Sequence, residues 1–464
     1  MVMNIGNTDN KQLDFLISAM SQGAFISTAD TLKWIEKQRK EVYSKSYRIP
    51  ISELNGWKFG DDRIRHDSGK FFSIDGIRVA TNYGLKPEWD QPIINQPEIG
   101  LLGFLTKKID GVLHFLVQAK IEPGNINVVQ LSPTIQATRS NYLRIHGGKK
   151  PSYLEYFTGE KNVTVLLDQL QSEQGARFLR KRNRNVIVEI GENEQIEIQD
   201  NYIWLSLGQI KELLRYPNVI NMDSRSVISC IKYGDYPQKE FQSLLSTQNN
   251  LHTLDDIIHW MSSLKCRYEL LVTSIGISNM NHWVFDGDTL HHEDNKFFEV
   301  IGVRSEISNR EVPCWDQPMI HSLQEGIMGF LVKKINGVYH FLVQAKLEAG
   351  NFDIIEMAPT VQCLTGNYRV GKNEYVVPYL DTILNAPKEN IWYSCYQSEE
   401  GGRFFQEQNL NVIVEVKEDF SIEVEENYCW MTLSQILLFA TYNNYLNSAA
   451  RSLISAITFR EARL

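Results

Sequence analysis

The stretch GLLGFLTKKIDGVLHFLVQAKIEPGN at residues 100–125 occurs a second time, as GIMGFLVKKINGVYHFLVQAKLEAGN at residues 326–351. The copies align without a gap, are identical at 19 of 26 positions and lie 226 residues apart. The same offset relates Trp34/Trp260, Trp57/Trp283, Trp89-Asp-Gln-Pro92/Trp315-Asp-Gln-Pro318, Pro133-Thr134/Pro359-Thr360, Ser172-Glu173/Ser398-Glu399 and Trp204/Trp430. A constant offset over so long a stretch indicates a duplicated domain, not an array of short repeats.

The pairing predicts how the chain is divided. We expect a first repeat at 13–216, a linker at 217–250, a second repeat at 251–446 and a C-terminal helix at 447–464. The linker is placed where the two copies carry little similarity in register.

Within the repeated stretch, Val112–Lys120 alternates between apolar and polar residues, which predicts a half-buried strand. Leu113, Phe115, Val117 and Ala119 form one face, and His114, Leu116, Gln118 and Lys120 form the other. Two interpretations of the second face remain open: a solvated outer surface, or a pocket wall. Retention of the same His, Gln and Lys in the second copy favours the pocket wall.

Each copy begins and ends with signals for a helix. Ser27-x-x-Asp30 and Thr253-x-x-Asp256 are typical helix starts, and Ser206-x-x-Gln209 and Thr432-x-x-Gln435 are capping boxes. Asn185–Glu189 and Gln195–Gln199 read as β-rich segments before Trp204. We therefore predict an α+β fold of two tandem α/β/α layered domains with mixed sheets.

Composition limits the function classes. With 464 residues and a net charge of −9, the chain lacks the excess of cations that a broad nucleic-acid surface needs. No apolar run approaches the ~20 residues of a membrane span, and no secretory signal is visible. The six cysteines are scattered without a CxxC pair, so we expect reduced thiols and a cytoplasmic protein.

Several long motifs resemble one known family, the sugar-nucleotide 2,3-dehydratases. They are Leu131–Tyr142 continuing to Arg144 and His146-Gly-Gly148, Trp89–Pro92, His114–Gly124 and Ser398–Phe404. The resemblance runs from about Phe15 to the 440s. It implies a dimer of subunits built from two Nudix-like domains, and a dTDP-4-keto-6-deoxyhexose substrate. It also implies a downstream NADPH-dependent 3-ketoreductase, and two pockets of which one is catalytic.

The chemistry implied by the resemblance needs no cofactor. It is a β-elimination, and the chain lacks a GxGxxG dinucleotide motif. The segments Gln171–Phe178 and Gln397–Phe404 also lack the glutamate-rich core of a Nudix hydrolase, so we expect no metal site.

The duplication suggests which residues bind the dTDP moiety. Both copies retain Trp89/Trp315, Gln118/Gln344, Lys120/Lys346, Thr134/Thr360, Gln136/Gln362, Asn141/Asn367, Tyr142/Tyr368 and Arg177/Arg403. Aromatic faces can stack on thymine, amides can pair with its edge, and cations suit the diphosphate. Core packing of the aromatics and a structural turn at Pro-Thr are the alternatives.

Polar residues present in one copy only are the candidates for catalysis. Arg139, Arg144 and His146 stand where the second copy has Thr365, Val370 and Lys372. His146 is the first choice for the acid/base because its ordinary pKa suits proton transfer near neutrality. Tyr153 and Glu155 are second choices, with partial counterparts in Tyr379 and Asp381, and Arg139 and Arg144 would hold the diphosphate. On this basis the N-terminal copy is expected to be catalytic.

Two other function classes stay open. The chain could be a Nudix-type nucleotide-sugar pyrophosphohydrolase, which would require Mg²⁺. It could also be a non-catalytic nucleotide-sugar binding protein, which would bind dTDP tightly without turnover.

Overall fold

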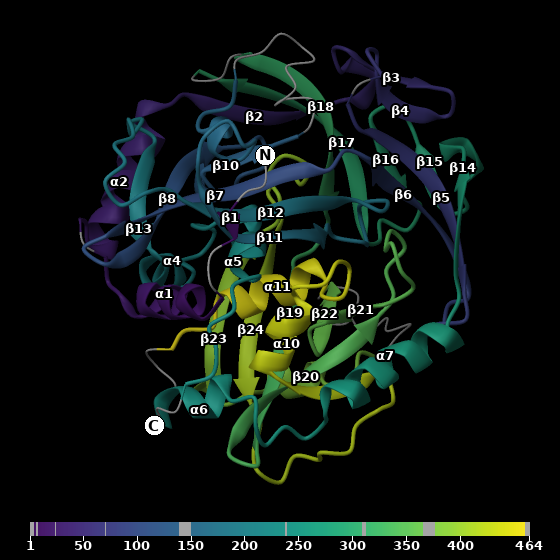
Figure 1. The fold of residues 1–464 in the computed structure, drawn as a ribbon. Helices are drawn as coiled ribbons and strands as arrows, with labels where there is room; N and C mark the ends of the chain where they lie inside the picture. The colour runs from purple at the N-terminus through teal and green to yellow at the C-terminus, as the bar shows by residue number, and fades with distance from the viewer. Residues whose placement is uncertain are drawn as a thin grey trace.

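The computed structural model describes residues 4–5, 8–23, 25–69, 71–138, 150–236, 239–308, 312–364 and 376–459. Within these residues the fold is α+β with mixed sheets, as predicted, and it contains two large and two small sheets (Figure 1). None of the described helices is long and apolar enough to cross a membrane.

The first large sheet and the helices of the first repeat come from the N-terminal half. The sheet contains β1 (Asn4–Ile5), β7 (Gly100–Ile109), β8 (Val112–Ile121), β9 (Val129–Ser132), β10 (Ile135–Ala137), β11 (Thr164–Ser172), β12 (Arg182–Glu189) and β13 (Tyr202–Ser206). The helices are α1 (Thr8–Met20), α2 (Thr28–Glu41), α4 (Leu207–Leu213) and α5 (Met222–Ile228), with 3-10 turns η1 (Ile51–Glu53) and η2 (Leu154–Tyr156). The sheet is mixed because β12 runs parallel to β7 whereas β8 is antiparallel to it.

The second large sheet has the same plan. It contains β19 (Gly326–Ile335), β20 (Val338–Lys346), β21 (Glu356–Ala358), β22 (Val361–Leu364), β23 (Ile391–Ser398), β24 (Gln408–Glu415) and β25 (Tyr428–Thr432). The helices are α6 (Lys239–Leu245), which packs on β20 and α10 as α1 packs on β8 and α4, then α7 (Leu254–Arg267), α9 (Leu380–Leu384), α10 (Leu433–Phe439) and α11 (Ser448–Ser455). The 3-10 turns are η3 (Ile277–Asn279) and η4 (Lys388–Asn390).

The two small sheets exchange one strand between the repeats. One sheet combines β3 (Trp57–Gly60), β4 (Arg63–His66), β5 (Ser73–Thr81) and β6 (Glu88–Asn95) with β14 (Leu270–Ile275) of the second repeat. The other combines β15 (Trp283–Phe285), β16 (Thr289–His292), β17 (Phe298–Ile307) and β18 (Cys314–Ser322) with β2 (Ser44–Ile49) of the first. Each small sheet therefore joins the two repeats by a full antiparallel ladder.

Helices α5 and α11 pack against each other at the centre, between the two large sheets (Figure 1). Every residue of both helices is buried. The segment 217–250, expected to be a linker, thus contributes α5 to the core. Its counterpart, α11, lies in the predicted C-terminal helix.

The two repeats also meet where the duplicated stretch ends. The N–H of Gly124 donates to the carbonyl of Gly401 (2.8 Å), and the N–H of Gly350 donates to that of Gly175 (2.7 Å). A Cβ at Gly124 would lie 1.7 Å from the carbonyl oxygen of Phe404, so this approach requires glycine.

Most local predictions are confirmed. Ser27 caps α2, and the helices that begin after Thr253, Ser206 and Thr432 each have a complete capping box. Gln195–Gln199, however, is not a strand. The Tyr153 hydroxyl donates to the carbonyl of Glu197 and accepts from the N–H of Gln199, so a side chain takes the place of a strand partner.

The predicted strand Val112–Lys120 is β8, but it is not half-buried. His114 and Leu116, on the face predicted to be polar, are 1% and 0% exposed. The His114 ring nitrogen Nδ1 hydrogen-bonds the carbonyl of Val112, and burial lowers its pKa. Only the end of this face, at Gln118 and Lys120, is partly exposed.

Candidate active site

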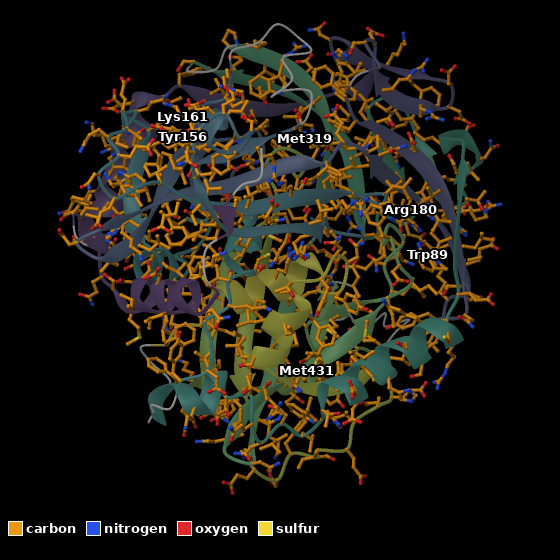
Figure 2. The ribbon with its side chains drawn as sticks, in the orientation of Figure 1. Trp89, Tyr156, Lys161, Arg180, Met319 and Met431 are labelled. Atoms are coloured by element: carbon orange, nitrogen blue, oxygen red, sulfur yellow. The ribbon has the colours of Figure 1, made fainter. Side chains whose placement is uncertain are left out.

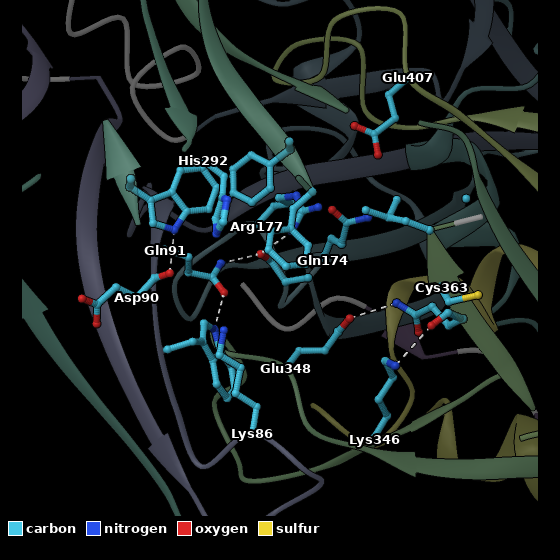
Figure 3. Close-up of a pocket in the computed structure, with 18 of the residues that line it drawn as sticks. Lys86, Asp90, Gln91, Gln174, Arg177, His292, Lys346, Glu348, Cys363 and Glu407 are labelled. Atoms are coloured by element: carbon cyan, nitrogen blue, oxygen red, sulfur yellow. Dashed lines mark hydrogen bonds between the residues drawn. The ribbon is translucent and has the colours of Figure 1, made fainter. Parts of the chain in front are cut away.

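A cavity of about 500 Å³ lies between the two repeats, and we call it the C-repeat cavity (Figure 3). Its floor comes from the second large sheet and includes Lys346 and Gln362. Trp89 and Arg177 of the first repeat line the opposite side, and Figure 2 places Trp89 beside the small sheets. The structure therefore brings four predicted binding residues together, but from different copies.

The Trp-Asp-Gln motif fixes the loop that carries Arg177. The indole N–H of Trp89 donates to the side-chain carbonyl of Gln91 (2.9 Å), and the Gln91 amide donates to the backbone carbonyl of Ala176 (3.0 Å). Asp90 accepts a bidentate pair of hydrogen bonds from Arg78, both 2.8 Å. The motif thus positions the cation next to the cavity.

Arg177 is held by a ring and a carbonyl. Its guanidinium lies 3.9 Å from the centre of the Phe298 ring, and Nη1 donates to the carbonyl of Ala176 (3.0 Å). Its buried Nε has no hydrogen-bond partner among the described residues. A buried guanidinium with an unused donor is suited to an anionic ligand.

A polar network covers the floor of the C-repeat cavity. Lys346 donates to the backbone carbonyl of Gln362 (3.2 Å), and the Gln362 amide donates to Glu348 (2.9 Å). Asn447, the N-cap of α11, donates to the Gln362 side-chain oxygen (2.8 Å). Burial raises the pKa of Glu348, although Lys346 opposes that shift.

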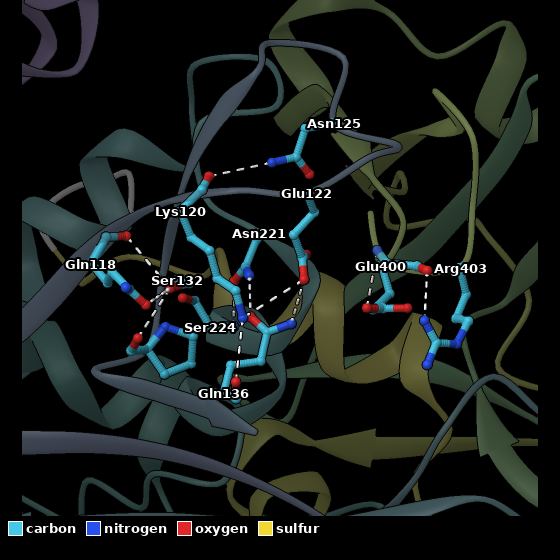
Figure 4. A network of polar contacts seen from close by, with 12 residues as sticks. Gln118, Lys120, Glu122, Asn125, Ser132, Gln136, Asn221, Ser224, Glu400 and Arg403 are labelled. Atoms are coloured by element: carbon cyan, nitrogen blue, oxygen red, sulfur yellow. Dashed lines mark hydrogen bonds and ion pairs between the residues drawn. The ribbon is translucent and has the colours of Figure 1, made fainter. Parts of the chain in front are cut away.

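The same network recurs in the first repeat, and we call it the N-repeat site (Figure 4). Lys120 donates to the backbone carbonyl of Gln136 (3.3 Å), whose amide donates to Glu122 (3.0 Å). Asn221, the N-cap of α5, donates to the Gln136 side-chain oxygen (3.1 Å). Across the site lies Arg403 of the second repeat, 4.0 Å from the centre of the Phe72 ring.

Charges differ between the two sites at several equivalent positions; Lys86 and Glu88 of the C-repeat cavity, for example, correspond to Val312 and Cys314. Gln174 of the C-repeat cavity corresponds to Glu400 in the N-repeat site, and Glu407 corresponds to Lys181. Burial and the nearby Glu122 carboxylate raise the pKa of Glu400 to about 7, and burial lowers the pKa of Lys181.

Two predicted binding residues have structural roles. The buried Thr134 hydroxyl accepts from the N–H of Leu105 and donates to the carbonyl of Leu116. Thr360 makes the equivalent pair of contacts with Leu331 and Leu342. Both Pro-Thr pairs thus serve as structural turns, the alternative left open by the sequence.

Gln118 and Gln344 lie at equivalent, partly exposed places on β8 and β20. Gln118 accepts a 3.4 Å hydrogen bond from the Ser132 hydroxyl. Neither glutamine contacts the C-repeat cavity.

The second-choice catalytic residues have protein partners. Tyr153 is 8% exposed and its hydroxyl is engaged with the backbone at residues 197 and 199. Glu155 forms an ion pair with Lys150 at 3.4 Å. The other predicted residues, Arg139, Asn141, Tyr142, Arg144, His146, Asn367 and Tyr368, lie outside the described residues.

The Glu and Asn members of the two networks were not predicted from the sequence. Glu122 and Glu348 are identical within the duplicated stretch, so their identity was an available signal. Asn221 and Asn447 are also 226 residues apart, but they fell in segments assigned to the linker and the C-terminal helix. Glu400 carried the other signal, that of a polar residue present in one copy only, but this signal was applied to Arg139, Arg144 and His146 and not to Glu400.

The arrangement is chemically suited to a polar, anionic organic ligand. Each site combines cations with amides and aromatic rings, whereas the described residues contain no group of three or more His, Cys, Asp or Glu able to hold a metal ion. All six cysteines are free.

Fold and sites together define a duplicated α+β protein with two related polar sites, each built from both repeats. The sequence model of the NDP-hexose 2,3-dehydratases matches residues 28–231 and again residues 254–457. The chain belongs to this family.

Three curated relatives are similar over nearly their whole length. A protein of Saccharopolyspora spinosa is 42% identical, over 97% of this chain and 95% of its own. Proteins of Amycolatopsis orientalis and Streptomyces violaceoruber are 40% identical, over 97% and 93% of this chain and 94% and 97% of theirs. All three are named dTDP-4-dehydro-6-deoxy-alpha-D-glucopyranose 2,3-dehydratase.

Proposed function

We propose that this chain removes water across C2 and C3 of dTDP-4-keto-6-deoxy-D-glucose, giving dTDP-3,4-diketo-2,6-dideoxyglucose. The observation that carries the proposal is the near full-length similarity to three relatives that share this activity in their names. The composite sites are consistent with it, because they offer cations for a diphosphate and amides for a base.

The reaction requires a base, stabilisation of an enolate and a proton for the leaving group. The C4 ketone acidifies the C3 hydrogen, hydroxide leaves from C2, and the resulting enol becomes a ketone at C3. In a gluco-configured sugar the C2 hydroxyl and the C3 hydrogen share a ring face. One side chain on that face can therefore remove the proton and return it to the departing oxygen.

We place the chemistry in the N-repeat site. Three cations, Lys120, Lys181 and Arg403, lie close enough to Glu400 to interact with it, and we assign them to the diphosphate. The segment carrying Arg139, Arg144 and His146 directly follows the strand that contributes Gln136. His146 stays a predicted acid/base, with Tyr153 and Glu155 as second choices. The C-repeat cavity would bind a nucleotide sugar without turnover.

The wider setting belongs to the same proposal. Each repeat would be a Nudix-like domain, and the chain would act as a cytoplasmic homodimer. Its unstable diketo product would pass to an NADPH-dependent 3-ketoreductase. Free cysteines are compatible with a reducing compartment.

The test is incubation with dTDP-4-keto-6-deoxyglucose, a 3-ketoreductase and NADPH, with NADPH oxidation and the 2-deoxy product measured together. Both should depend on the chain. Release of dTMP would instead support a pyrophosphohydrolase. Tight dTDP binding with no product would support a binding protein.

A further inference from the structure

The two sites differ most informatively at the position of Glu400. Its counterpart, Gln174, lines the C-repeat cavity and has no titratable group. The Lys-Gln-Glu network and the ring-stacked arginine occur in both sites. Carboxylates present in one copy only are candidates for chemistry; Glu400 is such a carboxylate at the N-repeat site, whereas Glu88 and Glu407 line the C-repeat cavity.

Glu400 is held in a defined place but is not neutralised by a close ion pair among the described residues. One carboxylate oxygen accepts the N–H of Gly402 at 3.1 Å, and the side chain is partly exposed to the site. Figure 4 shows it beside Arg403 and across from the Lys120–Glu122 pair. The charged groups that act on it are Glu122 and Lys120 from the end of β8, Arg403 from its own loop, Glu173 from the end of β11, Lys181 just before β12, and Asp223 from α5.

The other carboxylates of the cluster are less suited to meet a sugar. Glu122 accepts the Gln136 amide and lies 3.7 Å from the Lys120 ammonium. Glu173 accepts the Asn183 amide at 2.6 Å, and Asp223 is 4% exposed within α5. Glu400 is the member that combines partial exposure with few close contacts.

We propose that Glu400, supplied by the second repeat, is the catalytic base of the N-repeat site. This inference rests on the proposed function and assigns the removal of the C3 proton to Glu400 in place of His146. The raised pKa of Glu400, about 7, agrees with the role because a base works best when its pKa is near the working pH.

The step balances without an oxidant or a metal. The carboxylate takes the proton from C3, and the C3–H electrons move into the enolate of the C4 ketone. As the enolate collapses, C2=C3 forms, the C2–O bond breaks, and the Glu400 carboxylic acid returns its proton to the leaving oxygen as water. Tautomerisation then oxidises C3 and reduces C2, and Glu400 ends as the carboxylate.

The decisive variant is Glu400→Gln, which gives the N-repeat site the residue of the C-repeat cavity and keeps an acceptor for Gly402. We expect kcat in the coupled assay to fall at least ~100-fold. The dissociation constant for dTDP should stay within about threefold, since loss of a base acts on kcat rather than on ground-state binding. The exposed Glu418→Gln, which removes the same charge elsewhere, should match the wild type.

Solvent exchange and pH separate a base from a structural residue. In D₂O without the reductase, the wild type should wash deuterium into C3 of unreacted substrate, and so should His146→Gln, whereas Glu400→Gln should not. The wild-type kcat should rise with pH through about 7, and in Glu400→Asp this rising part of the pH profile should be shifted to a different pH. If Glu400→Gln does not fold, as judged by its melting curve, an unshifted pH profile in Glu400→Asp overturns the proposal.

Two results overturn the inference directly: near-normal kcat in Glu400→Gln, or exchange that is lost in His146→Gln and kept in Glu400→Gln. A wild type that yields neither product nor exchange would instead refute the proposed function. The two failures are thus distinguishable.

Discussion

The N-repeat site and the C-repeat cavity have the same frame and different charges. In both, a lysine, a glutamine, a glutamate and a helix-capping asparagine form one network, and an arginine of the other repeat stacks on a phenylalanine. Among the positions where they differ, Glu400 and Lys181 stand in place of Gln174 and Glu407. The duplication has therefore preserved the binding frame, whereas the charged groups around it have diverged.

Neither site belongs to one repeat. The cation-bearing loop of each copy hydrogen-bonds the glycine that ends the duplicated strand of the other copy. A single repeat would therefore carry half of each site. Each repeat therefore completes a site of the other repeat, just as β14 and β2 each complete a small sheet of the other repeat.

The largest effect on substrate binding should come from substitution of the stacked arginines. Arg403→Ala should raise KM for the sugar nucleotide roughly 10- to 100-fold, because a charged hydrogen bond contributes about 1.5–3 kcal/mol. Arg177→Ala should raise KM much less and should instead weaken a second dTDP site. Steady-state kinetics and calorimetry on both variants check this. A larger KM effect in Arg177→Ala would move the chemistry to the C-repeat cavity.

A smaller loss of dTDP affinity should show that each site is built from both repeats. Trp89→Ala and Lys346→Ala lie in different repeats but line one cavity, so both should weaken the same dTDP site, by about tenfold for each lost contact of ~1.4 kcal/mol. Titration calorimetry of each variant and of the double variant resolves the sites. If the two substitutions affect different sites, the cavity is not shared.

Sequence patterns predicted the local structure well, because helix caps and strand alternation depend on neighbouring residues. The capping boxes at Ser206, Thr253 and Thr432 and the strand of Val112–Lys120 are examples. Exposure was harder to predict: His114 follows a polar pattern yet is buried, since its ring nitrogen binds a carbonyl two residues away. Burial depends on what packs over a face, which the alternation does not contain.

The composite sites could not be predicted from the duplication alone. Because Trp89 and Trp315, or Lys120 and Lys346, are identical pairs, the sequence does not say which tryptophan meets which lysine. Only the long-range arrangement, with Gly124 against the 401–404 loop, decides it. Identity between copies identified part of the binding frame. Glu400 belongs to the opposite group, the polar residues present in one copy only, and the sequence alone does not say which members of that group lie at a site.

The pH dependence of stability should distinguish another pair of equivalent positions. Glu356 and Gln130 each accept a hydrogen bond from the serine that ends a strand of the other repeat, Ser172 of β11 at 2.7 Å and Ser398 of β23 at 2.9 Å. Burial raises the pKa of Glu356 to about 7, above the ~4.3 of an exposed glutamate. The folded state therefore keeps the Glu356 proton to a higher pH than the unfolded state does. The resulting contribution to the free energy of unfolding is complete below about pH 4 and is lost as pH rises through 7.

Glu356→Gln makes the two positions alike and should make the stability of the protein depend less steeply on pH. The melting midpoint of the wild type should fall more steeply between pH 5 and 8 than that of the variant. The difference in melting midpoint, variant minus wild type, should therefore be most favourable to the variant at pH 8. Other buried glutamates, Glu399 among them, keep some slope in both proteins. Parallel curves over this range would show that Glu356 is not protonated in the folded state.

The smallest expected effect is that of metal removal. Each carboxylate at the two networks already has a nearby cation or amide: Glu122 has Lys120 and Gln136, and Glu348 has Gln362. A hard divalent cation needs about six oxygen ligands, whereas the described residues offer no cluster of three candidate ligands. Turnover in the coupled assay should therefore survive exhaustive EDTA treatment, with the 3-ketoreductase tested alone under the same conditions as the control. Activity that disappears with EDTA and returns with Mg²⁺ or Mn²⁺ would mean that a metal completes one of the sites, and the proton transfer assigned to Glu400 would have to be reconsidered with that ion in place.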